Sequence, residues 1–204
     1  MVAPPTNGAI LAGGLARRMG GGDKPLRAIG GATLLAHITG RLRPQVASLV
    51  LNANGDSSRF AFCGLPVVAD SVGGNAGPLA GILAALEWSA ASAPDTQWVV
   101  TVPCDTPFLP SDLVDRLHTA RIADGAILSI AASGGRVHPV IGLWPVALRR
   151  ELREAVQESG IRRAGAFVAR FRYACADWEG EPDPFLNINT EADLQAADQR
   201  LSLR

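Results

Sequence analysis

Residues 8–25 of the chain, GAILAGGLARRMGGGDKP, decide its fold. The first five, Gly8 to Ala12, are an uncharged run that predicts a buried β-strand. The rest combine five glycines with three cations. Glycines let backbone N–H groups converge on an anion, and the cations neutralise its charge. Glycines alone favour a flexible turn, but glycines and cations directly after a strand favour a phosphate-binding loop.

Beyond this loop, short apolar runs alternate with segments of helical periodicity. Continuous apolar strands separated by helix-length segments predict a parallel sheet that is covered on both faces. We therefore expect an α/β protein with three layers, α/β/α. The apolar runs are residues 46–51, 66–69 and 98–102, and the helical segments are residues 33–43, 77–91 and 111–122.

The pattern changes after Gly125. Two strand-like runs, residues 126–131 and 137–144, flank Ser133-Gly134-Gly135, which predicts a hairpin or another small antiparallel excursion in the C-terminal half. Helices are expected at 146–157 and 161–171, and a strand at 172–178. The last helix opens with Thr190-Glu191-Ala192-Asp193, a capping-box pattern.

Length and composition indicate one soluble domain over residues 1–204. Hydrophobic residues make up 48% and charged residues 19%, and the net charge is zero, so nothing suggests bulk attraction to nucleic acid or to a membrane surface. The three cysteines, Cys63, Cys104 and Cys175, are far apart and include no CxxC pair. With no signal peptide visible, we expect a cytoplasmic protein.

The glycine-rich loop carries a resemblance to a known family. It lacks the Walker pattern, because Pro25 follows Lys24, and it lacks GxGxxG in dinucleotide register. Leu11-Ala12-Gly13-Gly14, Arg18-Met19-Gly20 and Asp23-Lys24 resemble the signature of nucleotidyltransferases with a Rossmann-like fold. Within that group the double glycine is similar to molybdenum cofactor guanylyltransferases. Further matches follow in the family's order at residues 50–54, 70–81, 103–107 and 187–190, so that the resemblance covers nearly the whole chain.

The resemblance implies an activity. Enzymes of this family transfer GMP from Mg²⁺-bound GTP to molybdenum-bound molybdopterin, which gives the guanine dinucleotide cofactor and pyrophosphate. Residues 1–124 would then bind mainly the nucleotide and residues 125–204 mainly the acceptor. A cofactor-donor protein and molybdoenzyme apoproteins are the further partners that it implies.

Two alternatives remain open. Pro25 stands where many of these guanylyltransferases have glycine, so a related nucleotidyltransferase with another base or acceptor, such as a molybdopterin cytidylyltransferase, is the nearest alternative. A non-catalytic carrier of nucleotide or cofactor is the alternative from another class.

Asp105 is the candidate metal ligand and, with Lys24 and Arg18, a candidate catalytic residue. It follows the strand at 98–102, between Pro103 and Pro107, where ligands of open α/β sheets bind. A carboxylate on a rigid turn suits Mg²⁺ that also binds phosphate oxygens. The alternative is that Asp105 caps the next helix, a role that Asp112 could fill as easily.

The resemblance also assigns a nucleotide site. Lys24 would hold the triphosphate as a point charge, and Arg18 could share that role. Asn52 has turn-capping before Gly55 as its alternative role, and Asp70 has an Asx-turn. The residues expected to bind nucleotide are Leu11, Ala12, Gly13, Gly14, Lys24, Asn52, Asp70 and Asp105.

The expected acceptor residues lie in the C-terminal half. Asn187 and Asn189 alternate with Ile188, which places both amides on one face of an extended chain. The resemblance makes them candidates for binding molybdopterin or surrounding the metal, and capping of the Thr190 helix is their structural alternative. His138 lies in a segment similar to one near the pterin in the family, although a lone histidine beside proline is more often structural.

Overall fold

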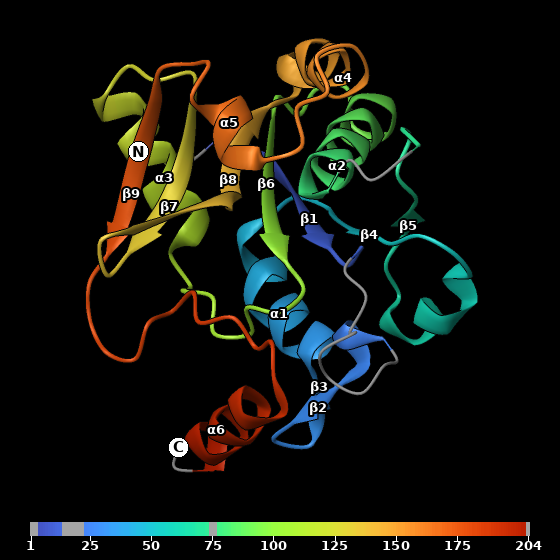
Figure 1. Ribbon diagram of the computed structural model, residues 1–204, viewed down its shortest axis with the longest axis vertical. Helices are drawn as coiled ribbons and strands as arrows, with labels where there is room; N and C mark the ends of the chain where they lie inside the picture. Colours follow the sequence, from blue (N-terminus) through green and yellow to red (C-terminus); the bar gives the residue numbers. More distant parts are fainter. Residues whose placement is uncertain (1–3, 14–22, 74–76, 203–204) are drawn as a thin grey trace.

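The computed structural model describes residues 4–13, 23–73 and 77–202 (Figure 1). A seven-stranded sheet runs through its centre in the order β5-β4-β1-β6-β8-β7-β9. Among the described strands of this sheet only β8 runs antiparallel to its neighbours. The strands are β1 Thr6–Leu11, β4 Leu49–Asn52, β5 Val67–Val68, β6 Trp98–Pro103, β7 Leu128–Ser133, β8 Arg136–Pro145 and β9 Tyr173–Trp178. The predicted α/β fold, mostly parallel with one antiparallel excursion, is confirmed.

Helices cover both faces of the sheet. Successive side chains of a strand point to opposite faces, so that Leu11 and Val99 belong to one buried cluster and Ile10 and Val100 to another. The first cluster packs against α2 (Pro78–Ser92), α4 (Arg149–Gln157) and α5 (Ala164–Val168). The second packs against α1 (Leu34–Leu42) and α3 (Leu113–Ala123). These are the three expected layers.

The β7–β8 hairpin makes the antiparallel excursion and also opens a cleft. Gly134 and Gly135 form its two-residue turn with φ of 53° and 72°, backbone angles that glycine adopts at little cost. Strand β8 pairs with β6 only as far as Gly142, and its pairing with β7 jumps from Gly142 to His138. Residues 139–141 are therefore released from the regular ladder beside the carboxyl end of β6, and this leaves room for a ligand.

A second, small sheet was not predicted. Strands β2 (Ala28–Ile29) and β3 (Ala32–Thr33) are two residues each, too short to show a periodicity. Helix α6 (Glu191–Ser202) packs beside them, where Ile29, Leu34 and Ile188 form a buried cluster with Leu194 and Ala197. The chain after β9 thus returns to the N-terminal half (Figure 1).

One predicted helix is shorter than expected. The segment predicted at 161–171 is helical only in α5, because the Ile161 N–H donates to the Ala155 carbonyl and still belongs to the closure of α4. Arg163 is extended and sets the start of α5. The capping box of the last helix is confirmed: the Asp193 N–H donates to Thr190 Oγ1, and the Thr190 N–H donates to Asp193 Oδ2.

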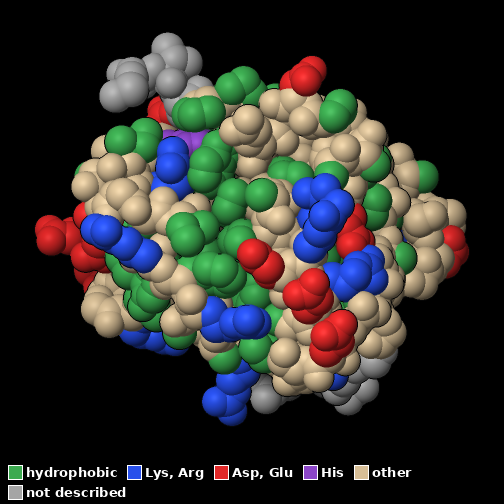
Figure 2. Space-filling view, turned by 90° about the horizontal axis from the view of Figure 1, so that it is seen from above, with side chains coloured by type: hydrophobic (Ala, Val, Ile, Leu, Met, Phe, Trp, Pro, Cys, Tyr) green, Lys and Arg blue, Asp and Glu red, His purple; other side chains and the backbone are tan. Residues whose placement is uncertain are grey.

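The surface drawn in Figure 2 carries basic and acidic side chains interspersed with apolar ones. Within the described parts of the chain, no helix is long and apolar enough to cross a membrane.

Candidate active site

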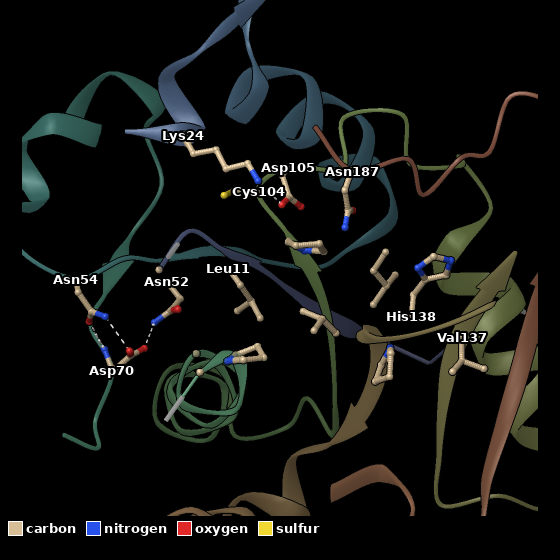
Figure 3. A pocket seen from close by; sticks show the side chains of 18 residues that line it. Leu11, Lys24, Asn52, Asn54, Asp70, Cys104, Asp105, Val137, His138 and Asn187 are labelled. Atoms are coloured by element: carbon tan, nitrogen blue, oxygen red, sulfur yellow. Dashed lines mark hydrogen bonds and ion pairs between the residues drawn. The ribbon is translucent and has the colours of Figure 1, made fainter. Parts of the chain in front are cut away.

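The cleft beside the end of β6 is a cavity of about 610 Å³, within the range of small-molecule sites (Figure 3). Strands β1, β4 and β6 are parallel and end at its floor, so their last residues and the loops after them meet there. The cavity has three parts: an ammonium–carboxylate pair, a cluster of amides around Asp70, and the apolar stretch of β8.

The centre of the cavity holds Lys24 and Asp105. The Lys24 ammonium donates to Asp105 Oδ2 at 2.6 Å and to Asn189 Oδ1 at 2.7 Å. The Lys24 side chain is 11% exposed, so this pair is little screened by water. Pro25 occupies the first turn of a short 3-10 helix, Lys24–Leu26, and its fixed φ suits that position. The residue that departs from the family pattern therefore supports the backbone that presents Lys24.

The segment carrying both candidate asparagines is tied to the Asp105 turn. The Ile188 N–H donates to the Asp105 carbonyl at 2.9 Å, and the Ile188 side chain is buried. Asn187 Oδ1 accepts from the Thr106 hydroxyl at 3.0 Å, while Asn189 binds Lys24. Both amides therefore approach the Asp105 turn, while their role toward molybdopterin or the metal stays a prediction. At the start of α6 only the backbone N–H of Asn189 takes part, by donating to Asp193 Oδ2. The Asn189 side chain therefore does not cap the helix.

The second part of the site is a cluster of amides around Asp70. Asn52 Nδ2 donates to Asp70 Oδ1 at 2.9 Å and Asn54 Nδ2 donates to Asp70 Oδ2 at 2.7 Å. Neither the turn-capping role of Asn52 nor the Asx-turn of Asp70 accounts for these bonds, because the carboxylate accepts from both amides (Figure 3). Asn54 was not predicted as a site residue. Its alternation with Asn52 just past a strand end is the signal that could have indicated it.

The end of β1 borders the same cavity. Leu11 and Gly13 line it, whereas Ala12 is buried and its N–H donates to the Asn52 carbonyl at 2.8 Å. Ala12 thus couples the ends of β1 and β4 rather than facing the cavity. Gly14 and Arg18, which were also predicted as site residues, lie outside the described residues.

Strand β8 forms the third part. Val137, His138, Pro139, Val140 and Ile141 line the cavity opposite the amide cluster. Burial lowers the pKa of His138 below its ordinary value, with Arg136 acting in the same direction and Asp183 against them. This apolar wall was not predicted beyond His138, because its exposure depends on the irregular pairing of β8.

Cys104 lies beside Asp105 but offers no nucleophile. Its thiol is buried, and burial together with the neighbouring carboxylate raises its pKa to about 12. A thiol is nucleophilic as the thiolate, which is negligible at neutral pH with such a pKa.

The donor set suits a cation held partly by substrate. Among the described residues there is no group of three or more His, Cys, Asp and Glu side chains that could enclose a metal. Asp105 is instead a single carboxylate that faces an open cavity. Mg²⁺ is commonly held by one or two carboxylates together with substrate phosphates and water, so these residues fit it in that form.

The three-layer α/β fold, with Lys24 and Asp105 paired at the strand ends, agrees with the nucleotidyltransferase class that the sequence predicts. Residues 8–172 match the family model of the MobA-like NTP transferase domain, and the chain belongs to this family.

Its relatives are similar over nearly their whole length. The chain is 54% identical over 201 residues to the molybdenum cofactor guanylyltransferase of Nitrobacter hamburgensis, covering 98% of this chain and 96% of the relative. It is 57% identical over 193 residues to the protein of the same name from Bradyrhizobium, covering 94% and 91%. The fold matches the crystal structure of molybdopterin-guanine dinucleotide biosynthesis protein A from Archaeoglobus fulgidus with a TM-score of 0.73 at 22% identity, over 97% and 100% of the two chains.

Proposed function

We propose that the protein transfers GMP from GTP to molybdenum-bound molybdopterin, releasing pyrophosphate. The observation that carries the proposal is the Lys24 ammonium, held between Asp105 and Asn189 at the centre of a cleft with a polar end and an apolar end. The names of the relatives supply the guanine base and the pterin acceptor, which the geometry alone does not specify.

The amide cluster is the proposed place for the nucleoside. The Asp70 carboxylate and the Asn52 amide oxygen can both accept from guanine N–H groups or ribose hydroxyls, because the two Nδ2 protons of Asn52 are already donated to Asp70 and to the Val68 carbonyl. The backbone of Leu11 and Gly13 borders the path toward Lys24. Gly14 and Arg18 complete this site by family resemblance. Residues 1–124 therefore form the proposed nucleotide half.

Charge neutralisation by Lys24 and Asp105 is the core of the proposed mechanism. Lys24 leaves its contact with Asp105 to bind the triphosphate, and the freed carboxylate would then hold Mg²⁺. When bound, Mg²⁺ stabilises negative charge on the phosphate oxygens. The acceptor's terminal phosphate oxygen forms a bond to the α-phosphorus as the bond to the bridging oxygen of pyrophosphate breaks. Such a transfer depends on positioning and charge stabilisation and needs no protein nucleophile.

The acceptor is proposed to bind along β8. His138 and Asn187 face this end of the cavity, and Asn189 links it to Lys24. Residues 125–204 form the proposed acceptor half. We also propose that the protein acts in the cytoplasm, with a cofactor-donor protein before it and molybdoenzyme apoproteins after it.

Pyrophosphate release tests this function. Purified protein is given Mg²⁺, molybdenum-loaded molybdopterin and one of GTP, CTP, ATP or UTP, and release with GTP alone is expected. Release with CTP would make the protein a cytidylyltransferase. No release from protein shown to bind a nucleotide would favour a carrier.

Asp105→Asn separates catalysis from binding in the same assay. This variant keeps the shape of the side chain but loses its charge, so we expect the fold and part of the nucleotide affinity to remain while kcat falls by about 100-fold or more. Asp115→Asn, on the exposed surface of α3, is the matched control. Turnover that survives in Asp105→Asn would contradict the metal-binding role.

A further inference from the structure

The buried hydroxyl of Ser133 lies behind the proposed acceptor end of the cleft. It has two hydrogen-bond partners but only one proton to donate. Ser133, the last residue of β7, is 2% exposed, and its Oγ lies 2.8 Å from Asp183 Oδ1 and 2.8 Å from His138 Nε2. Neither Ser133 nor Asp183 was predicted as a site residue from the sequence. The three side chains come from β7, β8 and the segment after β9, so that the fold rather than sequence proximity brings them together.

The direction of both hydrogen bonds follows from the proton count. A carboxylate only accepts, so the Ser133 hydroxyl donates its one proton to Asp183. Ser133 Oγ must then accept from His138, which requires a proton on Nε2. In a neutral imidazole the proton on Nε2 leaves Nδ1 with a lone pair. Burial favours the neutral ring, because it lowers the pKa of His138 below its ordinary value.

The ring is held in this orientation from a second side. The Phe185 ring is buried and its centroid is 5.1 Å from that of His138. The Phe185 N–H also donates to Asp183 Oδ1 at 2.8 Å, so the same carboxylate fixes the aromatic neighbour and the serine. Rotation of the imidazole would break the bond to Ser133 and the packing on Phe185 together.

The remaining ring nitrogen faces the cleft. His138 lines the cavity, and Figure 3 draws its imidazole with one nitrogen on the side of Asn187 and the other turned away. Because Nε2 is bonded to Ser133 on β7, the nitrogen on the cavity side is Nδ1. Among the residues that the structure describes, Nδ1 has no hydrogen-bond partner, and it is therefore available to a ligand.

We propose that Asp183 and Ser133 are positioning residues that hold His138 with its Nδ1 lone pair toward the acceptor substrate. Nδ1 then accepts a hydrogen bond from an N–H or O–H group of that substrate's ring system. A lone pair repels an anion, so the acceptor's phosphate lies away from His138, toward Lys24, the cation at the centre of the cleft. The two interactions together fix which end of the acceptor enters the reaction. The role of His138 toward the acceptor rests on the proposed function. The tautomer of the His138 ring does not depend on that function.

The tautomer can be measured without activity. The chain has three histidines, so a long-range ¹H–¹⁵N spectrum of the imidazoles is simple, and His138→Asn identifies the resonances of His138. At pH 7 the account predicts a protonated Nε2 and an unprotonated Nδ1. Asp183→Ala frees the Ser133 proton to be donated to Nε2, and the Nδ1–H tautomer should then become populated. A wild-type ring with the proton on Nδ1, or a charged ring, would overturn the proposal.

Kinetics test the consequence for the acceptor. Ser133→Ala should raise KM for molybdenum-loaded molybdopterin about threefold to tenfold and leave KM for GTP unchanged. Ser129→Ala is the matched control, because it removes another buried serine hydroxyl of β7, which donates to the Leu117 carbonyl away from the cleft. His138→Asn keeps an oxygen that can accept a hydrogen bond, whereas His138→Phe does not. KM for molybdenum-loaded molybdopterin should therefore rise much less in His138→Asn than in His138→Phe.

The outcomes separate the two proposals. Equal KM values for the acceptor in Ser133→Ala and Ser129→Ala would refute the positioning role even in an active enzyme. If the wild-type protein transfers no GMP, the proposed function fails, whereas the tautomer spectrum still decides whether Asp183 and Ser133 set the state of His138.

Discussion

Lys24 is the only lysine among the 204 residues, and its ammonium is shared between a carboxylate and an amide oxygen from distant parts of the chain. A triphosphate must compete with Asp105 for this cation. The strength of nucleotide binding is therefore the difference between two charge-assisted contacts rather than the sum of new ones. Sequence alone indicated that both residues belong to the site but gave no sign that they pair with each other.

Removal of the charge tests this competition. Lys24→Met should weaken GTP binding by about 10- to 100-fold, because a charge-assisted hydrogen bond to phosphate is lost, and titration calorimetry measures the change. Arg27→Met is the control, since Arg27 forms an exposed ion pair with Glu191 outside the cavity. Unchanged GTP affinity in Lys24→Met would contradict the assignment of the loop.

Gly81 determines how Asn52 is placed. A Cβ at residue 81 would lie 2.4 Å from Asn52 Oδ1, so any larger residue displaces the amide. We expect Gly81→Ala to raise KM for GTP several-fold by disturbing the bond between Asn52 and Asp70. Gly40→Ala is the control within a helix: a Cβ there meets nothing within 4 Å, and alanine should stabilise α1 by about 0.5–1 kcal/mol. A normal KM in Gly81→Ala would remove Asn52 from the nucleotide site.

At the scale of elements, the seven-stranded sheet and the helices packed on it were predictable because most of these elements carry an apolar run or a regular apolar period. The hairpin and the last helix were predictable from other signals, the turn Ser133-Gly134-Gly135 and the capping box at Thr190, whereas β2 and β3 are too short to carry a signal. The pairing of β8 did not follow, because the jump from Gly142 to His138 depends on contacts with two neighbouring strands. The apolar wall of the cavity depends on this irregular strand pairing and was not predicted. The hydrogen bond between Ser133 and His138 depends on it as well and was also not predicted.

The start of α6 joins helix stability to the site. Asp193 accepts from the backbone N–H groups of Asn189 and Thr190. The bond from Asn189 is the main cause that lowers the pKa of Asp193 below its ordinary 3.8. Asp193→Ala removes the oxygen that accepts both bonds and should lower the free energy of unfolding by about 1 kcal/mol at pH 7.

The pH dependence of this effect has a definite sign. Because the pKa is lowered in the folded state, the stabilisation is present above pH 3.8 and is lost as the pH falls through the folded value. Denaturant unfolding of wild type and Asp193→Ala should therefore converge below pH 3.8. Gln195→Ala, an exposed position of the same helix, should leave the unfolding free energy unchanged at either pH. A gap that persists in strong acid would mean that the carboxylate is not its source.

At the scale of the whole molecule, the cleft lies between two halves that the C-terminal segment ties together. The chain leaves β9, contributes Asp183 behind β8, and then passes Asp105 and Lys24 before α6 packs near β2 and β3. The division into a nucleotide half and an acceptor half is what the family resemblance implies, and it stays a prediction. The return of residues 187–189 to the N-terminal half could not be derived from the order of the motifs along the chain.

Stability of the whole fold should fall at mildly acidic pH because of His118. His118 is 2% exposed and its Nε2 contacts Thr6 Oγ1, while its buried Nδ1 has no hydrogen-bond partner in the described part of the chain. Burial, assisted by Arg121, lowers the pKa of His118 from 6.5 to about 4. The unfolded chain therefore binds a proton between these values while the folded protein does not, and stability is lost as the pH falls from 6.5 to about 4.

The size of this loss is on the order of 2–3 kcal/mol. His118→Gln keeps a hydrogen-bond donor for Thr6 but does not titrate, so its unfolding free energy should depend less on pH over the same range. Denaturant unfolding at pH 7 and pH 4.5 provides the comparison. Parallel losses in both proteins would assign the acid sensitivity to other groups.

The most direct test of nucleotidyl transfer follows the label of GTP. The protein is incubated with Mg²⁺, molybdenum-loaded molybdopterin and GTP labelled with ³²P at either the α- or the γ-phosphorus. Attack on the α-phosphorus predicts that the α-label appears in the pterin dinucleotide and that the γ-label leaves in pyrophosphate. Transfer of the γ-label to the acceptor, or retention of both labels in GTP, would contradict the account.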